Sequence, residues 1–365
     1  MPSFARRRAG RVAAALAAVA LAAGCAAQKS PADPAQEPTK APVKATATAT
    51  KYPVTIENCG RKVTFDEPPS RVVLLNGASV AEVESFLALG IEDAIVANGQ
   101  SYGVSDKPGM VDKVAAVPTG GVKLNENFEI PREQIVALRP DLVVSTWAGG
   151  FDDKIGSITR DQLDQAGINS LVTPVNCAYG APEALPADQQ RFDSQSVESS
   201  FELLLTLGEI FDVQQAAADH VNEARAELDK ITASARGKEP KSVLVAYPGM
   251  STMNNNGLPA VFGGGIYDDI IERAGGKNTF AGKDTADLAE INAEAMAAAD
   301  VDVLVVGLFQ PNEDGEKLAN DLFEKFPGWE ASKTRRFTTV SDSFYLGPLN
   351  TVAVQKIADA AHRDG

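Results

Sequence analysis

From residue 71 onward, short apolar runs alternate with stretches in which apolar positions recur at helical spacing. Residues 72–75 form a continuous apolar run, as in buried parallel strands, and an amphipathic stretch at 80–89 follows it and ends at Gly90. The same order recurs, with strands predicted at 95–97, 142–144 and 171–172 and helices at 132–138 and 159–165. This alternation predicts an α/β lobe built on a parallel sheet.

The pattern changes between residues 194 and 236, where a broad apolar face predicts one long helix that only Asp212 could interrupt. A helix of about 40 residues would be about 60 Å long. Alternation then resumes, with strands predicted at 242–246, 303–306 and 337–340 and helices at 266–274, 294–299, 317–325 and 351–361. The chain is therefore predicted to form two α/β lobes joined by a long helix.

The two halves also share a short local pattern. In each half a Glu near a predicted helix start, Glu133 or Glu294, is followed eight positions later by an Asp, Asp141 or Asp302, that opens an apolar strand. This self-similarity supports two lobes of the same kind.

The N-terminus has the pattern of an export signal. Four Arg within residues 6–11 precede an apolar run at 12–23 that is too short to span a bilayer. Small residues then lead to Cys25 in an arrangement that resembles a bacterial lipobox, although Leu21 lies one position further from the Cys than is usual. We expect a lipidated Cys25 as the first mature residue; an ordinary signal peptide with an incidental Cys is the alternative.

The expected domain organisation follows from these patterns. Residues 25–51 are rich in Ala, Pro, Thr and Lys, which is typical of a flexible tether. The predicted segments are a signal peptide at 1–24, a tether at 25–51, an N-terminal lobe at 52–193, a bridging helix at 194–236 and a C-terminal lobe at 237–365.

Apolar positions at 54–56 and 62–65 flank Cys59-Gly60, which predicts a short hairpin. Cys59 and Cys177 are the two cysteines left after Cys25. In an exported protein such a pair favours a disulfide, with two buried free thiols as the alternative.

Composition removes several classes of function. The 365 residues carry 49 Asp and Glu against 34 Lys and Arg, for a net charge of −15, which argues against a nucleic-acid binder. Two His and three Cys are too few for His-rich or Cys-rich metal sites, so we expect no metal site and no cofactor. No GxSxG, Walker or GxGxxG motif is present, and neither His220 nor His362 is placed as a catalytic base, so we expect no enzyme.

Taken in order, several segments resemble the lipoprotein substrate-binding subunits of ABC importers for iron-siderophores, haem and vitamin B12. The segments that carry this resemblance are EVESFLALG at 82–90, EQIVALRPDLVV at 133–144, the long stretch at 194–235, GGKN at 275–278 and EINAE at 290–294. The resemblance covers residues 52–361. It implies two Rossmann-like α/β lobes bridged by one long rigid helix, with a ligand cleft between the lobes.

Ligands of parallel α/β sheets bind beyond the carboxyl ends of the strands. Applied to both lobes, this rule predicts as ligand-binding residues Asn76, Gln100, Tyr102, Trp147, Tyr247, Phe309, Phe344 and Tyr345. Trp147 and Tyr247 could instead be core residues. Tyr179 and Phe262 are weaker candidates because each lies in a loop.

The resemblance also implies partners. Glu133 and Glu294 match the positions at which relatives dock one carboxylate per lobe onto Arg pockets of the permease. The expected partners are an ABC permease dimer with its ATPase, a small-molecule iron chelate, and the membrane through the lipid anchor, without nucleic acid. The protein is expected to be a monomer on the extracytoplasmic face of the cell membrane.

The class of ligand is narrowed by charge. A tricatecholate chelate needs several convergent cations, and Arg160, Arg191 and Arg335 are the only ones worth testing. A ferric siderophore of the hydroxamate kind is therefore favoured. Vitamin B12 and haem, for which Tyr could ligate the iron, are alternatives in the same role, and a signalling or adhesion lipoprotein without transport is an alternative of another class.

Overall fold

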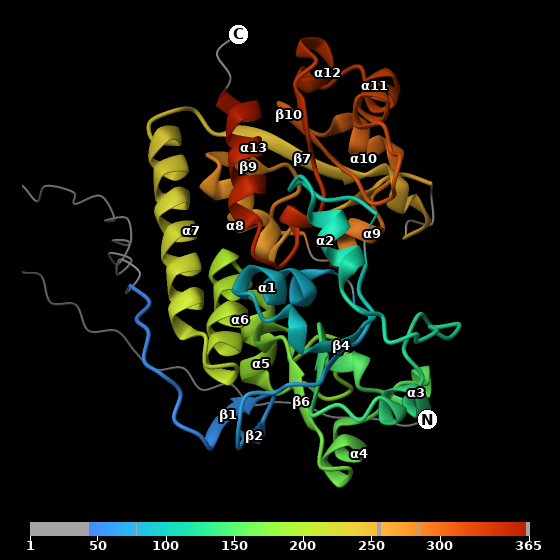
Figure 1. The fold of residues 1–365 in the computed structure, drawn as a ribbon. Coiled ribbons are helices and arrows are strands. Elements are labelled where there is room, and N and C mark those ends of the chain that lie inside the picture. Colours follow the sequence, from blue (N-terminus) through green and yellow to red (C-terminus); the bar gives the residue numbers. More distant parts are fainter. Residues whose placement is uncertain (1–43, 78, 102, 254–256, 284, 363–365) are drawn as a thin grey trace, which may run out of the picture. The chain divides into compact units, whose positions relative to one another are not determined.

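The structure is a computed structural model that describes residues 44–362, apart from residues 78, 102, 254–256 and 284 (Figure 1). The predicted signal peptide, Cys25 and most of the predicted tether lie outside the described residues. Within the described part, no helix is both long enough and apolar enough to cross a membrane.

The N lobe contains a four-stranded parallel sheet in the order β4-β3-β5-β6. Its strands are β3 (Val72–Leu74), β4 (Ile95–Asn98), β5 (Leu142–Ser145) and β6 (Asn169–Val172). Its helices are α1 (Ala81–Leu89), α2 (Met110–Ala116), α3 (Arg132–Ala137), α4 (Arg160–Gln165) and α5 (Pro186–Asp193). The predicted parallel α/β lobe is confirmed, whereas α2 and α5 were not predicted.

The predicted hairpin is present as β1 (Val54–Asn58) paired antiparallel with β2 (Arg61–Phe65). Its two loop residues, Cys59 and Gly60, both have positive φ, at 53° and 71°. Two positive values in succession define the type I′ turn, whose twist matches that of the strands. Cys59 at this turn is bonded to Cys177, 118 residues away, which confirms the predicted disulfide.

The C lobe contains a five-stranded sheet in the order β11-β10-β7-β8, with β9 also paired to β7. The strands are β7 (Lys241–Tyr247), β8 (Ala260–Val261), β9 (Gly276–Asn278), β10 (Val303–Gly307) and β11 (Phe337–Val340). The helices are α8 (Gly265–Arg273), α9 (Thr285–Ala289), α10 (Ala293–Ala298), α11 (Gly315–Lys325), α12 (Glu330–Thr334) and α13 (Asn350–His362). All pairings are parallel except that of β7 with β8, so the second predicted lobe is also confirmed.

The prediction of a single helix over 194–236 is wrong. The segment forms two helices, α6 (Val197–Ile210) and α7 (Gln214–Ala235), which pack side by side (Figure 1). Asp212 adopts a positive φ of 56°, and Val213 N–H donates to the carbonyl of Gly208. This bond is the 6→1 bond of a Schellman motif, which ends α6 and reverses the chain.

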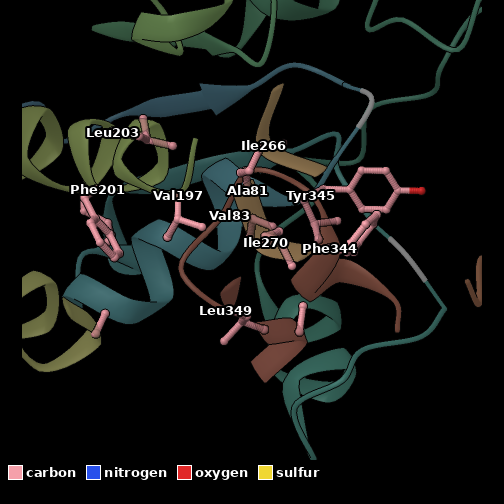
Figure 2. Packing of buried hydrophobic residues seen from close by; sticks show 14 of the residues in the cluster. Ala81, Val83, Val197, Phe201, Leu203, Ile266, Ile270, Phe344, Tyr345 and Leu349 are labelled. Atoms are coloured by element: carbon pink, nitrogen blue, oxygen red, sulfur yellow. The ribbon is translucent and has the colours of Figure 1, made fainter. Parts of the chain in front are cut away.

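The helix that joins the lobes is therefore α7 alone, with 22 residues and a length of about 33 Å. It packs against α1 and α6 of the N lobe and against α8 and α13 of the C lobe. One cluster of buried apolar side chains runs through all of these helices, and Figure 2 shows part of it.

The last part of the predicted tether lies against the α6–α7 hairpin. Ala45 exchanges two hydrogen bonds with the Asn222 amide, at 3.1 and 3.0 Å. Thr50 N–H donates to Asp212 at 2.9 Å, and the Tyr52 hydroxyl donates to the Ile210 carbonyl at 2.7 Å. The flexible tether was predicted to extend to residue 51, but the chain is already hydrogen-bonded to the folded part at residue 45.

Gly208 makes the close approach of α6 and α7 possible, because a Cβ atom added there would lie 2.6 Å from Ala217 Cβ. Alanine is favoured over glycine in helices by about 1 kcal/mol. We nevertheless expect Gly208→Ala to lower the free energy of unfolding by about 1–3 kcal/mol, because overpacking in a core outweighs that gain. Urea denaturation measures the change. Glu209→Ala, at the exposed neighbouring position, should alter it by less than about 0.5 kcal/mol, and a stabilised Gly208→Ala would contradict this account of the hairpin.

Candidate ligand-binding cleft

A cavity of about 320 Å³ lies between the two lobes. The N lobe contributes Ser79, Thr146, Asn176, Tyr179, Phe192 and Gln195. The C lobe contributes chiefly Met250, Phe262, Ile266, Tyr267, Tyr345 and Leu346. Many of these residues follow the carboxyl ends of parallel strands, including β3, β5, β6, β7 and β11. The cavity is therefore at the edge of both sheets where ligands of such folds bind.

Aromatic rings form the C-lobe wall. Phe262 lies with its ring centroid 5.1 Å from that of Tyr267, and Tyr345 meets both rings at near right angles, at 6.0 and 6.3 Å. Behind this wall, Tyr247 contacts Phe262 at 5.0 Å, and Phe344 stacks on Tyr267 at 5.2 Å. The rings hold one another in place, so the wall offers a large apolar surface that loses little conformational freedom when it binds a ligand.

The N-lobe wall combines two aromatic rings with amide groups. Tyr179 stacks on Phe192 at 5.5 Å. Gln195 Nε2 donates to Asn176 Oδ1 at 2.8 Å, and Asn176 Nδ2 donates to the Thr146 carbonyl at 2.7 Å. The side chains on this wall are thus neutral. No Asp, Glu, Lys, Arg or His lines the cavity among the described residues.

A buried carboxyl group supports the N-lobe wall of the cavity. Glu82, on α1, is fully buried and accepts hydrogen bonds from Gln100 Nε2 at 2.8 Å and from Thr146 Oγ1 at 2.7 Å. Its second oxygen accepts from the Thr173 hydroxyl. These donors come from the loops after β4, β5 and β6, so one side chain fixes three strand ends. Buried charge is tolerated where it is hydrogen-bonded in this way.

Burial shifts the pKa of the Tyr267 phenol and of both histidines. Burial, with a smaller effect of nearby Tyr179, raises the pKa of the Tyr267 phenol, which is therefore protonated at neutral pH. His220 and His362 are half-buried rather than solvent-exposed helix residues, and burial lowers the pKa of each. Neither histidine lines the cavity, and within the described part of the chain no cluster of His, Cys, Asp and Glu could hold a metal ion.

The predicted ligand residues fall into two groups. Tyr345 lines the cavity, as do the weaker candidates Tyr179 and Phe262. Tyr247 and Phe344 are fully buried and pack behind the lining rings. Ligand contact by Tyr345 stays a prediction, while Tyr247 has the position of a core residue, the alternative that the sequence left open.

Other predicted residues lie away from the lining. Gln100 is buried in the Glu82 network, and Trp147 packs behind Tyr179 with ring centroids 5.2 Å apart. Asn76 and Phe309 are half-buried and are not among the lining residues. Tyr102 lies outside the described residues. None of Arg160, Arg191 and Arg335 lines the cavity.

Several lining residues were not predicted, chiefly Ser79, Phe192, Gln195, Met250 and Tyr267. Tyr267 and Phe192 lie on helices, and the strand-end rule does not consider helices. The run Gly263-Gly264-Gly265 before Tyr267 was a usable signal, because glycine lets the backbone approach a ligand closely and Gly263 lines the cavity.

The two predicted docking residues occupy equivalent positions. Glu133 is the second residue of α3 and Glu294 is the second residue of α10, and both are exposed. Each helix precedes a central strand of its lobe, β5 or β10. The local symmetry inferred from the sequence is therefore present in the fold, and docking itself stays a prediction.

The chain belongs to the periplasmic binding protein family, whose model matches residues 73–342. This family consists of solute-binding proteins rather than enzymes, and membership implies a location outside the cytoplasm. No match is found among curated proteins.

Solved structures of the same fold support this assignment. An ABC-type Fe³⁺-hydroxamate transport system protein from Saccharomonospora viridis is 25% identical, with a TM-score of 0.59 over 85% of this chain and 99% of its own. The siderophore-binding protein BauB, bound to two molecules of acinetobactin and ferric iron, is 18% identical, with a TM-score of 0.61 over 86% of this chain and 100% of its own. The periplasmic haem-binding protein RhuT from a Roseiflexus species is 20% identical, with a TM-score of 0.53 over 80% of this chain and 99% of its own.

The Glu82 network yields a prediction about stability. Glu82→Ala removes the acceptor of Gln100, Thr146 and Thr173, and unsatisfied buried donors are costly. We expect the free energy of unfolding to fall by about 3 kcal/mol, as measured by urea denaturation. Glu133→Ala, which removes an exposed carboxylate, should change it by less than about 0.5 kcal/mol. Equal stability of the two variants would show that the Glu82 network does not stabilise the N-lobe wall of the cavity.

Proposed function

We propose that this protein captures a neutral ferric chelate of the hydroxamate class outside the cytoplasm and delivers it to the permease of an ABC importer. The observation that carries the proposal is the cavity between the lobes, whose described lining consists of aromatic, apolar and neutral polar side chains. A cavity of this chemistry desolvates a neutral ligand at low cost, whereas an unpaired charge brought into it would be penalised.

The alternative ligands differ from a hydroxamate in their charge or in the way that their metal is held. A tricatecholate chelate is polyanionic and needs convergent Arg or Lys, which the described lining lacks. Haem is the second candidate, because Tyr179, Tyr267 and Tyr345 line the cavity and a Tyr can ligate haem iron. Vitamin B12 binding in the same role is a further alternative, and signalling or adhesion without transport is the alternative of another class.

The likeness to known structures favours an iron chelate. The S. viridis protein belongs to an ABC-type Fe³⁺-hydroxamate transport system, and the match covers 85% of the chain described here. Similar folds also occur in a siderophore-binding and a haem-binding protein. The small-molecule partner that we propose is thus an iron chelate, with no nucleic acid and no resident cofactor.

Delivery requires an anchor and a docking surface. In this proposal Cys25 carries the lipid, the predicted tether connects it to the folded part, and the protein acts as a monomer. Glu133 and Glu294 then insert into cationic pockets of the permease dimer, one from each lobe. Paired carboxylate–Arg contacts fix orientation as well as affinity.

Ligand capture is testable by tryptophan fluorescence. Trp147 lies behind the cavity wall against Tyr179, whereas Trp329 is buried in the separate apolar core of the C lobe. We expect saturable quenching by ferrichrome, a neutral ferric trihydroxamate, and weaker or no quenching by a ferric tricatecholate, cobalamin and haem. Quenching by the tricatecholate alone would reject the neutral ligand, and no quenching by any of the four with intact folding would reject capture.

Two variants localise the signal. Tyr345→Ala removes a lining ring and should weaken ferrichrome affinity at least tenfold, since a well-packed aromatic contact contributes about 1.4 kcal/mol or more. Phe309→Ala changes an aromatic residue outside the lining and should leave affinity within about twofold.

Docking is testable separately from capture. The double variant Glu133→Ala/Glu294→Ala should bind ferrichrome with unchanged affinity, because neither residue lines the cavity. Uptake of radioactive iron from ferrichrome by cells that carry the variant should be abolished, because both contacts that orient the protein on the permease are lost.

The matched control is Glu126→Ala/Glu290→Ala, which removes one exposed Glu from each lobe. It should support normal uptake. Equal uptake by both double variants would refute the docking role.

A further inference from the structure

A second set of contacts joins the lobes, besides α7. The segment 341–350, between β11 and α13 of the C lobe, packs on α1 and α6 of the N lobe. Ser200 of α6 donates to Asn350 Oδ1 at 2.7 Å and accepts from Gly347 N–H at 3.0 Å. A Cβ atom added at Gly347 would lie 3.6 Å from Ala81 Cα of α1. Phe344, Tyr345 and Leu349 of this segment belong to the same buried cluster as Ala81 and Val83, and Figure 2 labels all five.

Asp106, in the N-lobe loop after β4, forms hydrogen bonds with the start of the same segment. Its Oδ2 atom accepts from Ser341 N–H and from the Ser343 hydroxyl, both at 2.5 Å. Its Oδ1 atom accepts from Lys356 Nζ of α13 at 2.6 Å, and its own N–H donates to Asp342 Oδ1 at 2.8 Å. Three contacts from one residue therefore fix the C-lobe segment to the N lobe, and a fourth fixes α13.

A pair of carboxyl groups meets inside this junction. Glu84, on α1, is 1% exposed, and Asp342, in the C-lobe segment, is 4% exposed. The Oε1 atom of Glu84 is buried without a hydrogen-bond partner among the described residues. Burial first, and then the charge of Asp342 and a hydrogen bond between the two side chains, raise the pKa of Glu84 well above its usual range.

We propose that Glu84 and Asp342 share one proton at neutral pH, and that this proton binds α1 of the N lobe to the segment that carries the cavity-lining residues Tyr345 and Leu346. Two buried carboxylates in contact repel each other when both are ionised, whereas one shared proton converts the repulsion into an O–H···O⁻ hydrogen bond. Glu84 is thus a positioning residue for the cavity wall.

The other charged groups at the junction do not replace this proton. Lys107 lies near Glu84 and favours its ionised form, but its effect is smaller than those of burial and Asp342. Lys356 is bound to Asp106, whose own negative charge further raises the pKa of Glu84. His220 of α7 is hydrogen-bonded to the backbone of Pro348. Burial lowers the pKa of His220, so this side chain adds no charge at neutral pH.

The direction of the pH effect follows from the raised pKa. Below the ordinary Glu pKa of about 4.3, Glu84 is protonated both in the folded and in the unfolded chain, and its contribution to stability is complete. As the pH rises further, the unfolded chain releases the proton while the folded chain retains it. Stability is therefore lost progressively up to the folded pKa. His220 acts in the opposite direction, because its lowered pKa costs stability in acid.

Infrared difference spectroscopy tests the shared proton directly. At neutral pH the wild type should show the carbonyl band of a protonated carboxylic acid in addition to that of Glu129, whose pKa burial raises to about 7. Glu84→Gln should lack the additional band, Asp342→Asn should shift its frequency because the hydrogen-bond partner changes, and Glu129→Gln should keep it. If the wild-type spectrum at neutral pH contains no such band beyond that of Glu129, the shared proton is refuted, whether or not the variants fold.

Urea denaturation across pH supplies a second measurement. Relative to Glu84→Gln, the unfolding equilibrium constant of the wild type should rise by up to tenfold per pH unit above about pH 4.3, the slope for one proton. His220→Gln should retain this rise. Parallel profiles for the wild type and Glu84→Gln would overturn the proposal.

The effect on the cavity wall rests on the proposed function. Ferrichrome affinity of the wild type should weaken at alkaline pH, and that of Glu84→Gln, which keeps a neutral hydrogen-bonding group, should be independent of pH. Equal profiles would refute the positioning role. If the wild type binds no ferrichrome, the proposed function fails, and the infrared and unfolding measurements still decide whether the proton is shared.

Discussion

The contact of the Asp106 carboxylate with the segment 341–350 is the interaction on which the cavity depends. The helix α7 joins the lobes along one side, but a single helix does not fix how far two lobes open. Asp106 binds the start of the segment through Ser341 and Ser343, and it also binds Lys356 of α13. Because Tyr345 lies within the segment, the same hydrogen bonds that hold the lobes together also place one wall of the cavity.

Local signals made most of the fold predictable from the sequence. Apolar runs placed the central strands of both sheets, and Cys59-Gly60 between two strand patterns gave the hairpin. The long helix was wrong because apolar periodicity continues across residues 211–213. Its break depends on Gly208, which lets α7 lie against α6, and on Asp212, which accepts from Thr50 N–H far away in the sequence. Neither contact produces a pattern of apolar and polar residues that can be recognised in the sequence.

The candidate site was predictable to the correct edge of the sheets but not to the side chain. Tyr247 ends β7, yet its ring points behind the cavity and contacts Phe262, because strand alternation decides which face a side chain takes. Tyr267 reaches the cavity from α8, a helix that the strand-end rule ignores. Arg160, the candidate cation for a tricatecholate, is buried and donates to Ser170 and the Asn58 carbonyl.

The cavity of so acidic a protein is neutral because the buried carboxyl groups beside it lie outside its lining. Glu82 and Glu84 lie two positions apart on α1, and both are buried beside the cleft. Glu82 accepts hydrogen bonds from three donors, which satisfy its buried oxygen atoms. Glu84 faces the carboxyl of Asp342 instead, and burial, followed by the charge of Asp342, raises its pKa well above the usual range. Neither acidic side chain lines the cavity, whose described lining is neutral and therefore suits a neutral ligand.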